Sequence, residues 1–134
     1  MELALSNSVL SGVGLSGTDY FYTNPLRQHD TAPVQLRWSR TRVPFVTSFC
    51  CPPNVVRTVA EVGGYAYARS PGTIWVNLYG AGTLDTILHD KPLQITQVTD
   101  YPWNGDIQFR LDACCEAPFA IRLRIPEWTE DPKF

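Results

Sequence analysis

The spacing of apolar residues changes once along the chain, from the period of a helix to the period of a strand. Residues 1–10 and 53–62 place apolar side chains at helical spacing, and glycines follow each stretch, as at a helix end. From residue 73 onward apolar and polar residues alternate, which is typical of half-buried antiparallel strands. The alternation covers residues 73–79, 93–98, 107–111 and 119–125, and residues 85–88 are a further strand candidate that leads to a turn. We therefore expect helices in the first half and sheet structure in the second.

Two further segments of the first half have the composition of strands. Residues 19–23 and 35–40 suggest a hairpin whose long polar loop holds His29. We expect the main boundary near residue 70, so that residues 1–70 form one part and residues 71–134 another. Four or five short strands joined by turns in that second part favour an antiparallel β-sandwich, or a portion of one. The predicted fold class is mainly β with a few helices.

Composition and charge exclude several classes of partner. The formal net charge is −2 and no basic face is apparent, which argues against nucleic acid or an anionic membrane. No apolar run approaches the roughly 20 residues of a membrane span, and Met1 and Glu2 begin no signal peptide. Four cysteines in two adjacent pairs do not resemble a secreted disulfide framework. We therefore expect a reducing compartment, the cytoplasm.

The adjacent residues Cys50 and Cys51 are the strongest candidates for chemistry. Their Cα atoms are about 3.8 Å apart, less than the roughly 4.4 Å at which ordinary disulfides begin, so a relaxed bond is not expected. Pro53 suits the first turn of a helix, which would place both thiols at a helix N-terminus, where the dipole favours a thiolate. A thiolate is a nucleophile or a metal ligand. The alternative is two small apolar side chains packed under the helix start, and the residues alone leave both interpretations open.

The remaining titratable residues have weaker cases. No partner in the sequence accompanies His29 or His89, and we expect both to be solvated. Cys114 and Cys115 fall in an expected turn and are interpreted as structural. A redox switch built on the cysteine pairs is disfavoured by the geometry of adjacent residues. The carboxylates expected at the surface or in turns are Glu61, Asp100 and Asp106.

Seven short motifs, taken in their order and spacing, resemble one known family. They are ELALSN at 2–7, FYTNPL at 21–26, CCPPN at 50–54, GYAY at 64–67, VNLY at 76–79, TDYPWNG at 99–105 and LRIPEW at 123–128. Together they resemble the zinc-dependent, cysteine-nucleophile β-L-arabinofuranosidases of glycoside hydrolase family 127. The similarity runs over nearly the whole chain.

The resemblance implies a fold and a site. Residues 1–70 would be the C-terminal remnant of an (α/α)6 catalytic barrel, in the order helix, β-hairpin, helix, and residues 71–134 part of a β-sandwich. Cys50 would be the nucleophile and a zinc ligand, and Cys51 a second zinc ligand. In such enzymes a glutamate and another cysteine complete the zinc site, and a separate glutamate is the general acid/base.

The sequence departs from the family pattern, because those other residues would lie ahead of Met1. We therefore expect a truncated portion, inactive alone, of a retaining glycosidase acting on L-arabinofuranosides. Glu2 matches a position downstream of the missing glutamates and is not assigned to catalysis. The expected partner of the chain is an upstream domain or a second copy of the chain. The alternative function is a non-catalytic carbohydrate-binding or interaction module, with sugar rings stacked on Trp75, Tyr79, Trp103 and Trp128.

Overall fold

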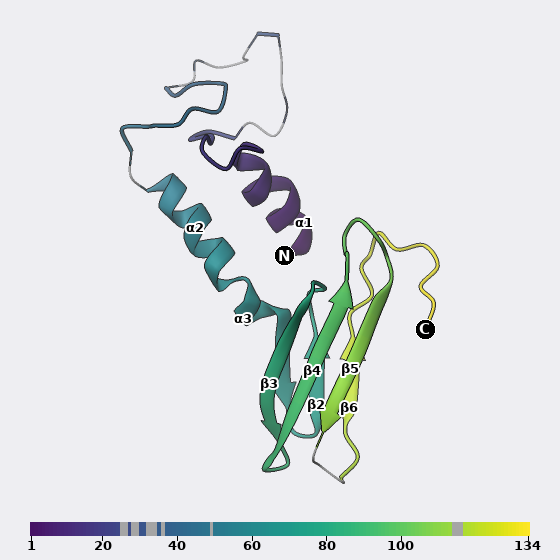
Figure 1. The fold of residues 1–134 in the computed structure, drawn as a ribbon. Helices are drawn as coiled ribbons and strands as arrows, with labels where there is room; N and C mark the ends of the chain where they lie inside the picture. Colours follow the sequence, from purple (N-terminus) through teal and green to yellow (C-terminus); the bar gives the residue numbers. More distant parts are fainter. Residues whose placement is uncertain (25–26, 28–29, 32–34, 36, 49, 114–116) are drawn as a thin grey trace. The chain divides into compact units, whose positions relative to one another are not determined.

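The computed structural model divides the chain into two compact units, residues Met1–Val62 and Gly63–Phe134. It describes all residues except 25–26, 28–29, 32–34, 36, 49 and 114–116 (Figure 1). The boundary expected between residues 70 and 71 stays a prediction. Among the described residues, none of the helices combines the length and the apolar character that crossing a membrane requires.

Unit 1 begins with a helical stretch, as the spacing predicts. It runs through α1 (Glu2–Ala4), a π-helical turn η1 (Leu5–Val9) and a 3₁₀ turn η2 (Leu10–Gly12). The backbone N–H of Val13 donates to the carbonyl of Leu10 at 3.0 Å and closes this stretch. A 3₁₀ turn is frequent at the end of a helix, whereas a π-helical turn such as η1 is rare.

The prediction that residues 19–23 and 35–40 form a hairpin is wrong. Tyr20 instead forms isolated antiparallel bridges with Val13 and Val43, and the described residues of the two segments form no ladder with each other. Serine hydroxyls engage the nearby backbone instead: Ser39 Oγ accepts from the N–H of Thr41 at 3.1 Å. Such local side-chain bonds compete with strand pairing. His29 lies outside the described residues.

The predicted cysteine helix is present as α2 (Cys51–Glu61), which begins two residues ahead of Pro53. Prolines suit its first turn because backbone N–H groups there have no helical partner. The helix ends at Glu61, and the two glycines expected to stop it lie in a separate turn, α3 (Gly63–Ala66), at the start of unit 2. No residue of α2 is buried, and Val56 is 69% exposed.

Unit 2 contains two three-stranded sheets, drawn one in front of the other in Figure 1. The strands are β1 (Tyr67–Ser70), β2 (Thr73–Val76), β3 (Gly82–Leu88), β4 (Lys91–Thr99), β5 (Ile107–Ala113) and β6 (Ala120–Leu123). One sheet has the order β1-β2-β6, the other β3-β4-β5. The four alternating segments and residues 85–88 each overlap one of the strands β2 to β6, and β2 is central in its sheet, as predicted.

Two features of these sheets differ from the prediction. Strand β6 was expected to be antiparallel but pairs in parallel with β2, with Ile74 opposite Ile121. The physical reason is that β5 belongs to the other sheet, so the chain crosses between sheets before β6 enters beside β2. Strand β1 was not predicted at all; it pairs with β2 through a hairpin in which Ser70 lies opposite Thr73 and Gly72 adopts a φ of 65°.

The apolar core of unit 2 draws on both sheets. Its buried members are Ile74 from β2, Leu88 from β3, and Leu93 and Ile95 from β4. Partly buried apolar side chains from the remaining strands, including Phe109 and Ile121, pack against them. Burying each such aliphatic side chain contributes about 1.5–3 kcal/mol. The shared core is what holds the two sheets together.

Candidate functional site

The two adjacent cysteines lie at the N-terminus of α2, where the position of the prolines places them. Cys50 is the N-cap residue and is exposed, whereas Cys51 is the first helical residue and is half-buried. Both are free thiols, and their Sγ atoms lie 3.5 Å apart. Asn54 stabilises the first helical turn, because its Nδ2 donates to the Cys50 carbonyl at 2.8 Å. The pair is therefore an exposed dithiol held by the first helical turn.

The two thiols differ in acidity. The Ser48 hydroxyl, 3.1 Å from Cys50 Sγ, is the main cause that lowers the pKa of Cys50, and the hydrogen bond with Cys51 adds to it. Burial is the main cause that raises the pKa of Cys51, followed by its bond to Cys50 and the charge there. The pair therefore loses its first proton from Cys50, and the Cys51 S–H then donates to the resulting thiolate.

A third group, the Tyr22 hydroxyl, also acts on the pair. Its hydrogen bonding lowers the pKa of both thiols, although the causes named above are larger for each of them. The Tyr22 ring packs on Trp38 with a centroid distance of 4.5 Å, and the Arg37 guanidinium lies 5.1 Å from the centre of the Trp38 ring. Tyr22 thus belongs to an aromatic group that positions its hydroxyl.

Sequence reasoning did not identify Ser48 or Tyr22 as part of this site. Ser48 is two residues from Cys50, and a hydroxyl at that spacing from a helix start is a local signal that could have indicated it. Tyr22 was assigned only to a predicted strand. The contact between Tyr22 and the cysteines depends on the tertiary fold, and the spacing of residues in the sequence does not predict it.

The geometry of the pair fits two corners of a tetrahedral metal site. With Zn–S bonds of about 2.3 Å, two thiolates on one zinc ion are about 3.8 Å apart. The observed 3.5 Å separation needs only a small adjustment. Within the part of the chain that the structure describes, no three His, Cys, Asp or Glu side chains gather as a complete set of ligands. The geometry of the pair therefore suits two of the four ligands of such a site.

The other candidates from the sequence do not join this pair. Glu61 is exposed at the opposite end of α2. His89 is exposed in the turn between β3 and β4, with a φ of 51°. Asp100 and Asp106 are exposed in the loop between β4 and β5. Cys114 and Cys115 lie outside the described residues.

Comparison with protein families assigns the two parts of the chain to one enzyme family. Residues 1–64 match the β-L-arabinofuranosidase, GH127 catalytic domain, and residues 73–134 match the β-L-arabinofuranosidase, GH127 middle domain. A curated relative from Bifidobacterium longum subsp. longum, a non-reducing end β-L-arabinofuranosidase, is 26% identical over 137 residues. That alignment covers 96% of this chain and 20% of the relative.

Solved structures give the same result. One chain described as a glycoside hydrolase is 46% identical, with a TM-score of 0.84, and is matched over 97% of this chain and 22% of its own length. A GH127 β-L-arabinofuranosidase from Geobacillus stearothermophilus T6 is 32% identical, with a TM-score of 0.86, over 98% of this chain and 21% of its own. The chain thus spans about a fifth of the length of the relatives it matches.

Proposed function

The chain belongs to glycoside hydrolase family 127, and from that premise we propose that it supplies the nucleophile of a retaining glycosidase that releases β-L-arabinofuranose. The observation that carries the proposal is the exposed Cys50 thiol, whose pKa is lowered by Ser48 and whose sulfur lies 3.5 Å from that of Cys51. Exposure gives a sugar access to the sulfur, and the lowered pKa raises the fraction present as the nucleophilic thiolate.

In the proposed reaction, Cys50 takes the part that a carboxylate has in most retaining glycosidases. The Cys50 sulfur attacks the anomeric carbon, an S–C bond forms, and the C–O bond to the leaving group breaks. The leaving oxygen takes a proton from a general acid. A water molecule then attacks the same carbon, loses a proton to the same group and releases the sugar, so that the configuration is retained after two inversions.

Zinc is the cofactor in this proposal, and Cys50 and Cys51 are the residues that would hold it. When bound, zinc keeps a thiol sulfur deprotonated and oriented. The proposal needs two further ligands and a general acid/base, and it assigns none of these to the 134 residues of the chain. The chain alone is therefore expected to be inactive as a glycosidase.

The proposal includes a place for each part of the chain in the fold. The helical residues of the part matched to the catalytic domain, α1 to η2 and α2, would belong to the end of an (α/α)6 barrel. The two sheets of the part matched to the middle domain would be a portion of a β-sandwich. The shared apolar core of the two sheets supports the second assignment.

Labelling with a substrate-like reagent tests the proposal on the chain itself. A haloacetamide attached to L-arabinofuranose should modify Cys50 faster than Cys51, and intact mass and peptide mapping would identify the labelled sulfur. A haloacetamide without sugar is the matched reagent. Preferential labelling of Cys51 by both reagents would contradict the assignment of the nucleophile. Hydrolysis of an aryl β-L-arabinofuranoside by the isolated chain, abolished in Cys50→Ser, would contradict the claim that essential groups lie elsewhere.

A further inference from the structure

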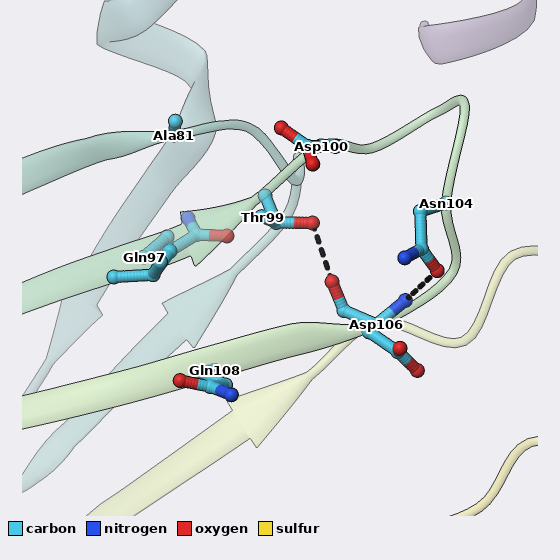
Figure 2. A pocket seen from close by; sticks show the side chains of 8 residues that line it. Ala81, Gln97, Thr99, Asp100, Asn104, Asp106 and Gln108 are labelled. Carbon is cyan, nitrogen blue, oxygen red and sulfur yellow. Dashed lines mark hydrogen bonds between the residues drawn. The ribbon is translucent and has the colours of Figure 1, made fainter.

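Unit 2 carries a pocket that takes no part in the proposed reaction. It has a volume of about 440 Å³ and lies where β4 ends and the loop to β5 begins (Figure 2). This volume is within the range of about 300–1,000 Å³ that small-molecule sites occupy. The lining residues are Ala81, Gln97, Val98, Thr99, Asp100, Asn104, Asp106 and Gln108.

Hydrogen bonds fix the loop that forms one wall of the pocket. Thr99 Oγ1 donates to the carbonyl of Asp106 at 2.6 Å, and the N–H of Asp106 donates to Asn104 Oδ1 at 3.0 Å (Figure 2). The carbonyl of Asp100 accepts from the N–H groups of Trp103 and Asn104 at 3.0 and 3.3 Å. The wall is thus held in shape before any ligand arrives, which lowers the entropic cost of binding.

One buried polar atom in the lining has no hydrogen-bond partner in the part of the chain that the structure describes. Gln97 is only 3% exposed, and its Nε2 donates to the Tyr67 hydroxyl at 2.6 Å and to the Leu78 carbonyl at 3.4 Å. Its Oε1 is buried and accepts no hydrogen bond from the described residues. Figure 2 shows this oxygen directed along β4 toward Thr99 and Asp100. A buried carbonyl oxygen without a donor is unfavourable, so a donor from a ligand would be stabilised there.

The polar groups of the lining define the class of ligand. Gln97 Oε1 and the Asp100 carboxylate accept hydrogen bonds, whereas the amide groups of Asn104 and Gln108 can donate. Among the described residues that line the pocket there is no lysine or arginine, which disfavours an anion. A metal ion is also disfavoured, because no three His, Cys, Asp or Glu side chains gather among the described residues. A hydroxyl group both donates and accepts, and it suits this mixture of groups.

We propose that this pocket is a binding site for a neutral saccharide, held through its hydroxyl groups by Gln97, Asp100 and Asn104. The site goes beyond the proposed hydrolysis, because it uses neither Cys50 nor Cys51. The function of the site would be to hold a carbohydrate on unit 2. Binding should therefore persist in a Cys50→Ser variant, so the two proposals fail or survive separately.

Titration of the ¹⁵N-labelled chain with L-arabinose, followed by NMR, tests the site. Saturable shifts are expected at the amides of residues 97–108. Asp100→Ala should weaken binding at least about tenfold, which corresponds to about 1.4 kcal/mol. The matched control is Asp112→Ala, which removes an exposed carboxylate from β5 outside the pocket and should leave the affinity unchanged.

A second variant addresses the buried oxygen. Gln97→Met keeps the length of the side chain but removes Oε1, and it should abolish the shifts, with thermal unfolding recorded as a check of the fold. If Gln97→Met does not fold, Asp100→Ala alone still decides. The proposal is overturned if L-arabinose causes no saturable shift, if both aspartate variants bind equally well, or if calcium chloride or methylammonium shifts the same amides while the sugar does not.

Discussion

The shared core of unit 2 allows the loss of stability from one core substitution to be estimated. Ile95 on β4 is 0% exposed and lies in the cluster that joins the two sheets, whereas Ile87 on β3 is 59% exposed. Replacing a fully buried isoleucine by alanine costs about 2–5 kcal/mol, because the transfer free energy is lost and a cavity remains. For a domain of about 60–100 residues each kcal/mol lowers Tm by about 4–8 °C. Ile95→Ala should therefore lower the Tm of unit 2 by at least about 8 °C.

Ile87→Ala is the matched control, since it makes the same change on the neighbouring strand of the same sheet. It should alter the free energy of unfolding by no more than about 0.5–1 kcal/mol. Thermal unfolding followed by circular dichroism would measure the Tm of both variants, and chemical denaturation followed by tryptophan fluorescence would measure their free energies of unfolding. Equal destabilisation by the two substitutions, or a larger effect of Ile87→Ala, would refute the inference that the sheets share one core through this face of β4.

Two further predictions concern the cysteine site. Ser48→Ala removes the main cause that lowers the pKa of Cys50, so the pKa should rise and alkylation of Cys50 by iodoacetamide should become slower at any pH below it; an unchanged pH profile of the alkylation rate would speak against this role, and Ser39→Ala serves as the control. If the pair is half of a zinc site, elemental analysis should find zinc bound to the purified wild-type chain when other ligands complete the coordination, and the double variant Cys50→Ser, Cys51→Ser should bind none under those conditions. Zinc bound in equal and non-zero amounts by both proteins would exclude the pair as ligands.

The elements that the sequence predicted well are those encoded by local patterns. Alternation over residues 93–98 indicated β4, and the prolines after Cys51 indicated the start of α2, because each pattern acts within a few residues. The parallel pairing of β6 with β2 could not be read in this way. It depends on the chain crossing between sheets, and alternation is the same in a parallel and an antiparallel strand that is half-buried.

The failed hairpin has a related cause. The aromatic and β-branched residues in 19–23 favour a strand, but a strand needs a partner in register, and the partner of Tyr20 turned out to be Val43 rather than the segment 35–40. The site shows the same division between local and distant information. Cys50, Cys51 and Ser48 are close in sequence, whereas Tyr22 reaches them only through the fold.

The two adjacent cysteines are alike in sequence but differ in surroundings, and this difference favours Cys50 as the nucleophile that we propose. The hydrogen bond between the thiols lowers the pKa of Cys50 and raises that of Cys51. Because two like thiols share this bond, it does not by itself determine which of them becomes the more acidic. Ser48 supplies that asymmetry, because its hydroxyl lies 3.1 Å from Cys50 Sγ. Burial adds to it, since Cys51 is less exposed and its charged form is disfavoured. The more accessible sulfur is therefore also the more acidic one, as a nucleophile requires.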